Sequence, residues 1–398
     1  MIVEGKMTSA EIFADKIEEA ALIWLKELCD HPAMEGVPVV QMPDVHAAAN
    51  CNVGTAYPIG MYVNLDHVGV DIGCTISAHR LSVPVNQEDL PILDHRIREA
   101  IPMGTEICTK NSLNEKELFR FLNSQYQKAR SAAPDLINET PRIDARFITD
   151  FCRRIKLQEG IFYKSLGTLG GGNHFIEYGE EETSGEGWLA IYCGSRNLGV
   201  KVVNHWHNIA QNPKRAKYTG FLWGDSLKGY LSDMVIAQAY ALYNHQIIRD
   251  RIFAILRKLC KAKCADSIFT THNYISVTDE LPMLRKGAID ASKGRKVVIP
   301  FNMRDGIAIC IGKGNREWLN TAPHGAGRIM SRAQARKQID MDDFRQTMSG
   351  VFSTSICGAT LDESPMAYKP TEEIMELIKP TVGIISMIKP KLNIKDIG

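Results

Sequence analysis

The chain has 398 residues, of which 44% are hydrophobic and 23% charged, and its formal net charge at pH 7 is +1. This composition is typical of a globular protein with a substantial core, and the near-neutral charge argues against a protein that coats nucleic acid with a broad basic surface. The first residues resemble neither a signal nor a transit peptide, and no apolar run is long enough for a membrane span. With the ten cysteines expected as reduced thiols, the sequence predicts a cytoplasmic protein.

The first predicted helix covers residues 9–29. Thr8 and Glu11 have the spacing of a capping box, and apolar residues then recur about every 3.6 positions. The same periodicity predicts helices at residues 114–132 and 229–260. Runs rich in β-branched residues predict strands at residues 37–42, 188–194, 267–277, 296–300, 306–312 and 381–388.

These elements do not alternate regularly between strand and helix. A doubly wound parallel sheet requires such alternation, so the sequence favours an α+β fold with mixed sheets. The length alone is compatible with two or three domains as well as with one large enzyme domain.

The stretch TAPHGAGRIMSR, residues 321–332, places a histidine among very small side chains. Residues 325–327 leave the imidazole of His324 accessible. We expect a helix to begin at residue 328, where free N–H groups favour an anion, and Arg328 and Arg332 would lie one turn apart on it. Together these groups indicate a phosphate site, but a glycine-rich helix start with a surface histidine fits the stretch equally well.

Two further glycine-rich stretches carry candidate metal ligands. In HVGVDIGC, Asp71 and Cys74 lie three residues apart, and a carboxylate and a thiolate at that spacing can face one ion. A buried cysteine at a tight turn is the commoner reading of such a match. In GGGNHFIE, Asn173, His174 and Glu177 follow three glycines that let backbone approach a phosphate or metal. A flexible turn before a strand is the alternative.

Weaker signals come from single polar residues. His272 and Asn273 lie in a strand-like run, where a histidine is more often a satisfied core residue. Arg196 lies in a glycine-flanked turn that suits either a phosphate contact or an ordinary hairpin. Asp44 and His46 form an acid–imidazole pair at the end of a strand.

The combination of motifs is more specific than its parts. MPDVH, VGVDIGC, GGGNHFIE, GSRNLG, HNY, RKGA, HGAGRIMSR and DESPMAYK follow one another in this order. They resemble the RtcB family of RNA ligases from Met42 nearly to the C-terminus, and HGAGR-x-MSR and GGGNHF-x-E are the most specific signatures. The resemblance implies a single RtcB-like catalytic domain over residues 1–398, with mixed sheets surrounded by helices and with helix 9–29 as an appendage.

The resemblance also implies an activity. The protein would be a GTP- and Mn²⁺-dependent ligase that joins RNA 2′,3′-cyclic phosphate or 3′-phosphate ends to 5′-hydroxyl ends, in RNA repair or tRNA splicing. The histidine matching His324 would attack the α-phosphorus of GTP and carry GMP, and neutral imidazole is a competent nucleophile at pH 7. GTP and RNA are the implied partners, and no membrane is involved. A metal-dependent phosphohydrolase or cyclic phosphodiesterase, and a non-catalytic RNA-binding homologue, are the alternatives.

The resemblance assigns roles to individual positions. The family binds manganese through an aspartate, a bridging cysteine and three histidines, and one or two ions are expected here, with zinc or cobalt as possible substitutes. The matching positions are Asp71, Cys74, His174 and His272 for the metal; Asn173, Glu177, Gly327, Tyr368 and Lys395 for GTP or GMP; and Arg196, Arg328 and Arg332 for RNA phosphates.

The chain departs from the family at one ligand position. The family motif HSGSR reads YCGSR, so Tyr192 replaces a histidine ligand. A phenol with a pKa near 10 is a poor ligand at pH 7, and Cys193 is expected to point to the opposite face of its strand. We therefore expect the second metal to be bound weakly or to be absent. Further departures at Thr75 and at residues 300–304 indicate a divergent branch, specialised for repair of a particular RNA.

Overall fold

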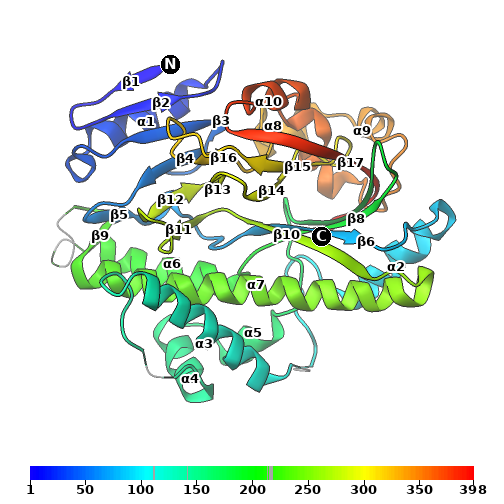
Figure 1. The fold of residues 1–398 in the computed structure, drawn as a ribbon, viewed down its shortest axis with the longest axis horizontal. Coiled ribbons are helices and arrows are strands. Elements are labelled where there is room, and N and C mark those ends of the chain that lie inside the picture. Colours follow the sequence, from blue (N-terminus) through cyan, green and yellow to red (C-terminus); the bar gives the residue numbers. More distant parts are fainter. Residues whose placement is uncertain (111–112, 141, 213, 215–217) are drawn as a thin grey trace.

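The computed structural model describes residues 1–110, 113–140, 142–212, 214 and 218–398. Two large β-sheets lie in the upper half of the view in Figure 1, and the long helix α7 runs beneath them with α3, α4 and α5 on its far side. This arrangement confirms the predicted α+β fold with mixed sheets and surrounding helices. Within the part of the chain that the structure describes, no helix combines the length and apolarity that crossing a membrane requires.

The first sheet has six strands in the order β1-β2-β3-β4-β12-β11, and it is mixed because β2 and β3 run parallel. Its strands are β1 (Ile2–Glu4), β2 (Ser9–Ile12), β3 (Val39–Ala47), β4 (Asn52–Pro58), β12 (Met283–Lys286) and β11 (Tyr274–Ser276).

The second sheet has seven antiparallel strands in the order β10-β6-β8-β7-β17-β15-β14. The two edge strands lie close together, since Val298 N donates to Thr270 Oγ1 at 2.8 Å, so the sheet curls toward a barrel. Its strands are β10 (Cys264–Thr271), β6 (Thr75–Leu81), β8 (Gly187–Cys193), β7 (Phe175–Glu181), β17 (Val382–Ile394), β15 (Ile307–Gly312) and β14 (Lys296–Pro300).

Two small ribbons and a set of helices complete the fold. The ribbons pair β13 (Ala288–Asp290) with β16 (Thr321–Pro323) and β5 (Tyr62–Asn64) with β9 (Phe221–Trp223). The α-helices are α1 (Glu19–Asp30), α2 (Leu90–Ala100), α3 (Glu115–Ala132), α4 (Ala145–Arg154), α5 (Glu159–Lys164), α6 (Asn197–Ala210), α7 (Gly224–Cys260), α8 (Arg332–Gln338), α9 (Met341–Thr347) and α10 (Thr371–Leu377). Short 3₁₀ helices lie at Pro32–Met34, Leu65–His67, Gln87–Asp89, Gly358–Glu363 and Pro365–Ala367.

The prediction of a helix over residues 9–29 is wrong in its first half. Ser9–Ile12 forms β2, and α1 begins only at Glu19. Ala10 and Ile12 are buried while Ser9 is exposed, so this segment alternates with the period of a strand and pairs with both β1 and β3. Tertiary pairing therefore overrides the local helix signal.

The predicted helices at residues 114–132 and 229–260 are confirmed as α3 and α7. Asn114 caps α3, because its side chain accepts a hydrogen bond from Glu117 N. Helix α7 has 37 residues and is buried along most of its length, because it packs against both sheets.

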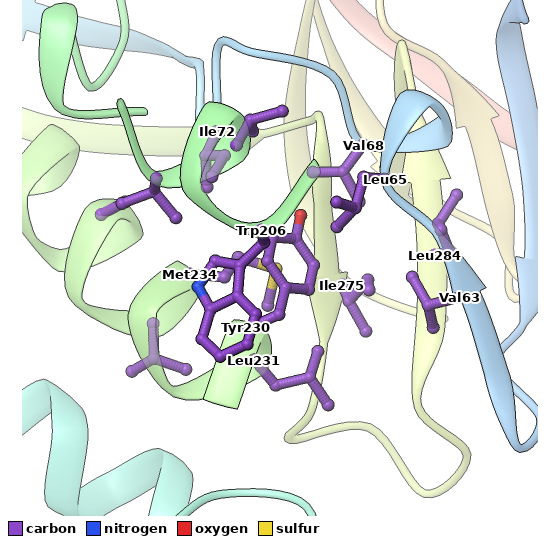
Figure 2. Packing of buried hydrophobic residues seen from close by; sticks show 14 of the residues in the cluster. Val63, Leu65, Val68, Ile72, Trp206, Tyr230, Leu231, Met234, Ile275 and Leu284 are labelled. Carbon is purple, nitrogen blue, oxygen red and sulfur yellow. The ribbon is translucent and has the colours of Figure 1, made fainter. Parts of the chain in front are cut away.

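The largest hydrophobic cluster packs α7 against the first sheet and α6. Figure 2 shows Tyr230, Leu231 and Met234 of α7 beside Trp206 of α6, with Ile275 and Leu284 facing them from β11 and β12. All of these side chains except Trp206 are almost completely removed from water. Burial of these side chains stabilises the packing of α7 and α6 against the first sheet.

A buried carboxylate joins three helices around this cluster. Asp233 of α7 accepts two hydrogen bonds of 2.7 Å from Arg154 of α4 and one of 2.7 Å from Trp206 Nε1 of α6. The arrangement satisfies a charge that would otherwise be costly to bury.

We predict that Asp233→Ala lowers the free energy of unfolding by about 2–4 kcal/mol, because it leaves a guanidinium and an indole N–H without their acceptor. The shift of the denaturant midpoint measures it. Asp250→Ala at an exposed position of the same helix is the control and should change stability by less than about 0.5 kcal/mol. Equal effects of the two substitutions would contradict the role given to Asp233.

Candidate functional site

A cavity of about 300 Å³ opens where the two large sheets, the ribbon β13–β16 and the C-terminal segments meet. Its walls come from residues far apart in the sequence. The predicted site residues that line it are Asp71, Asn173, Glu177, His272, His324, Gly327, Arg328, Arg332, Tyr368 and Lys395, together with Tyr192. Cys74 and His174 lie buried behind Asp71, which they contact, and do not themselves line the cavity.

His324 follows directly after β16 and is held by a buried acid. Its Nδ1 lies 2.7 Å from Oδ2 of Asp44, a residue of β3 that is completely buried. A neutral imidazole that donates Nδ1–H to a carboxylate keeps its lone pair on Nε2. Gly327 lets the two segments approach, because it has φ of +72° and a Cβ there would lie 2.3 Å from Asp44 O. The arrangement presents a nucleophilic nitrogen beside the cavity.

The prediction of a helix beginning at residue 328 is wrong. Arg328 forms an isolated β-bridge with Tyr368, and α8 begins only at Arg332. The guanidinium of Arg328 donates to the carbonyls of Met330 and Asp362, which holds this stretch in an extended path. Ser331 caps α8, so the free N–H groups of that helix do not follow directly after His324.

Three candidate metal ligands converge. One ligand atom each of Asp71, Cys74 and His174 lies within 4.8 Å of the others. His174 Nε2 is 3.0 Å from Asp71 Oδ2 and 3.5 Å from Cys74 Sγ. Carboxylate, thiolate and imidazole suit a first-row divalent metal, and such an ion would fit between them.

The two acidic groups of this cluster have opposite pKa shifts. Burial alone would raise the pKa of Asp71, but the contacts with His174 and Cys74 lower it to about 2. Burial raises the pKa of the Cys74 thiol well above its usual value, and the Asp71 carboxylate adds to the effect. A metal ion would reverse this for the thiol, because a coordinated cysteine is deprotonated.

His272 lies outside this cluster. Its Nε2 is 2.9 Å from the hydroxyl of Tyr192, which also accepts a hydrogen bond of 3.3 Å from Asn173 Nδ2. The imidazole ring of His272 lies against that of His324, with ring centroids 4.6 Å apart. Cys193 points to the other face of β8, as predicted, and its Sγ contacts Asn244 of α7.

Glu177 reaches the cavity from β7 as a buried acid. Its Oε2 accepts a hydrogen bond of 2.7 Å from Asn393, its neighbour across the ladder on β17, while Oε1 has no partner among the described residues. Burial raises the pKa of Glu177 to about 8 in spite of these contacts. The side chain therefore offers an unpaired oxygen to a ligand.

Three basic residues of the cavity gather on one carboxylate. Glu363 lies 2.9 Å from Lys395 Nζ, 2.7 Å from the guanidinium of Arg332 and 3.5 Å from that of Arg328. Tyr368 donates its hydroxyl to Glu363 at 2.8 Å. Burial opposes ionisation of Glu363, but Lys395 and the two arginines bring its pKa down to about 2.

Arg196 lies apart from Arg328 and Arg332. It donates to Thr168 Oγ1 at 3.0 Å and to Gly104 O at 2.6 Å, and it does not line the cavity. Arg196 has a positive φ of 55°, so its backbone conformation is unusual for a residue with a side chain.

Sequence reasoning missed the partners that complete the site. Asp44 was noticed beside His46, but its side chain holds His324 instead. Glu363 and Asn393 carried no role, although Glu363 belongs to the motif DESPMAYK, whose two acids precede a tyrosine and a lysine. This local density of charged and polar residues is the sequence signal that could have marked Glu363 as part of the site.

Comparison with known proteins identifies relatives along almost the whole chain. A family model described as tRNA-splicing ligase RtcB matches residues 26–396. The chain is 28% identical over 369 residues to the RNA-splicing ligase RtcB of Escherichia coli K12, with 85% of each chain covered. It is 24% identical over 454 residues to the tRNA-splicing ligase RtcB of Archaeoglobus fulgidus, covering 92% of this chain and 87% of the relative. For the tRNA-splicing ligase RtcB of Nanoarchaeum equitans the identity is 25% over 445 residues, covering 94% and 92%.

The raised pKa of Glu177 predicts a pH-dependent stability. Between its ordinary pKa of 4.5 and about 8, the unfolded chain releases this proton while the folded chain keeps it. Stability should therefore fall as the pH rises through this window, by about 1–3 kcal/mol from this residue. In Glu177→Gln that loss should disappear, which unfolding midpoints at about pH 5 and pH 8 measure.

Glu27→Gln at an exposed position of α1 is the matched control and should keep the wild-type pH profile. If Glu177→Gln also keeps that profile, the carboxyl group of Glu177 is not protonated in the folded protein.

Proposed function

The chain belongs to the RtcB family, and we propose that it is an RNA ligase that uses GTP and a divalent metal to join RNA 2′,3′-cyclic phosphate or 3′-phosphate ends to 5′-hydroxyl ends. The observation that carries the proposal is the contact between Asp44 and His324, which leaves Nε2 as a nucleophile at a cavity with basic walls. The names of the curated relatives, all RNA- or tRNA-splicing ligases, support the same class of reaction.

The first step would be guanylylation of His324. Nε2 attacks the α-phosphorus of GTP, a phosphorus–nitrogen bond forms, and pyrophosphate leaves with the bonding electrons. Asp44 stabilises the positive charge that develops on the imidazole ring. The small residues 325–327 leave the approach to the ring open.

The second and third steps would join the RNA ends. After hydrolysis of any cyclic phosphate, an oxygen of the RNA 3′-phosphate attacks the guanylate phosphorus and releases His324. The 5′-hydroxyl oxygen then attacks the RNA 3′-phosphorus, a phosphodiester bond forms, and GMP leaves. Each displacement needs positive charge around the transferring phosphoryl group, and Arg328, Arg332 and Lys395 supply it at the cavity wall.

Other residues would position the nucleotide and the metal. Asp71, Cys74 and His174 would hold the divalent ion, which neutralises phosphate charge when bound. Oε1 of Glu177 would face the N–H groups of guanine, which would favour the ionised carboxylate over the protonated form that burial favours without a ligand. The aromatic ring of Tyr368 offers a surface for the base.

We predict that labelled GTP with Mn²⁺ leaves a covalent guanylate on the protein that survives denaturing electrophoresis. His324→Ala should abolish the label. Asp44→Asn should reduce the rate of labelling about 10–100-fold, because the imidazole loses the acceptor that orients it and stabilises its charge. Asp250→Asn at an exposed position is the matched control and should label at the wild-type rate.

The experiment separates the alternatives. A phosphohydrolase needs no covalent guanylate, so RNA-end hydrolysis without any label would favour that function over ligation. A label that persists in His324→Ala would contradict the assignment of the nucleophile.

A further inference from the structure

We propose that this cavity binds a single divalent cation, at Asp71, Cys74 and His174, and that the hydroxyl of Tyr192 takes the place of a second ion. The inference rests on the proposed metal-dependent function and deepens it. It decides between the one and the two ions that the family resemblance left open.

The first position has a complete set of converging donors. His174 Nε2 lies 3.0 Å from Asp71 Oδ2 and 3.5 Å from Cys74 Sγ, so a small shift of these side chains would enclose an ion. The side chains of Cys74 and His174 are buried, and Asp71 also lines the cavity. An ion there would therefore be open to a phosphate oxygen on one side only.

His272 does not form a second position. Asn173 Nδ2 donates to the oxygen of Tyr192, and the same hydroxyl lies 2.9 Å from His272 Nε2 and is hydrogen-bonded with Cys74. The neighbours of His174 Nε2 are a carboxylate and a thiol, which can bind an ion together with the imidazole. The neighbour of His272 Nε2 is a phenol, which keeps its proton at pH 7 and is a poor ligand.

The other nitrogen of His272 offers no alternative. Among the residues that the structure describes, the only three or more His, Cys, Asp and Glu side chains with ligand atoms within 4.8 Å of one another are Asp71, Cys74 and His174. Nδ1 of His272 is buried, and within the described part of the chain it has no hydrogen-bond partner and belongs to no such group. A second ion would lack the donors that hold the first.

The tyrosine at position 192, where the family has a histidine, changes the contacts of the imidazole ring that lies beside His324. The rings of His272 and His324 lie with centroids 4.6 Å apart, and His272 is held by a neutral hydrogen bond instead of by a cation. Phosphate charge at His324 must then be met by one ion and by the basic side chains of the cavity, which are Lys286, Arg328, Arg332 and Lys395.

The test is metal stoichiometry of the full chain. Metal-free protein is titrated with Mn²⁺ or Co²⁺ by calorimetry, and the metal content is measured after removal of free ion. Wild-type protein should bind one ion per chain, and Cys74→Ala should weaken it at least about tenfold. Tyr192→His should bind two ions, because the new imidazole supplies a donor next to Cys74 and releases His272. Tyr192→Phe is the matched control, since it removes the hydroxyl without adding a ligand, and should bind one.

Two ions bound tightly by the wild-type protein would overturn the inference, and so would a folded Tyr192→His that binds only one. If that variant does not fold, the Mn²⁺ electron paramagnetic resonance spectrum of the wild-type protein decides: an isolated ion supports the inference, and a spin-coupled pair overturns it.

Labelling with GTP distinguishes a failure of the single-ion inference from a failure of the proposed ligase function. Labelled protein with two ions overturns only the stoichiometry, whereas one ion without any labelling supports the stoichiometry and counts against the ligase.

Discussion

Glu363 is buried and contacts Lys395, which follows β17, Arg332 of α8, and the loop residues Arg328 and Tyr368. Three cations at one wall of a cavity would repel one another if no anion lay between them. The Glu363 carboxylate at their centre, together with Asp362 on Arg332, lowers that cost and holds the C-terminal segments together. The walls of the site therefore depend on this acid, although it is not itself a candidate for chemistry.

The contacts with Glu363 also keep the basic side chains in position for a polyanionic ligand. The cations are satisfied by Glu363 while no phosphate is present, and they keep their orientation toward the cavity. A nucleotide would then find a preorganised set of donors, which costs less reorganisation than recruiting flexible surface side chains.

Two other acids, the buried Asp44 and the partly exposed Asp71, lie in different environments. Asp44 contacts one imidazole, that of His324, whereas Asp71 contacts the imidazole of His174 beside a thiol. The first environment suits the proposed role of His324 as a nucleophile, and the second suits a cation. Tyr192 lies between these two environments. Its hydroxyl is hydrogen-bonded to His272, and the ring of His272 packs against that of His324.

Local patterns in the sequence determined the family, the α+β class and the long helices α3 and α7, since periodicity and short motifs are properties of neighbouring residues. They also marked His324 as accessible and Tyr192 as a departure. Tertiary structure decided the rest. It turned residues 9–12 into a strand, joined Asp44 to a histidine 280 positions away, and placed Arg196 outside the cavity. Which carboxylate meets which cation depends on how distant segments pack, and no local pattern carries that information.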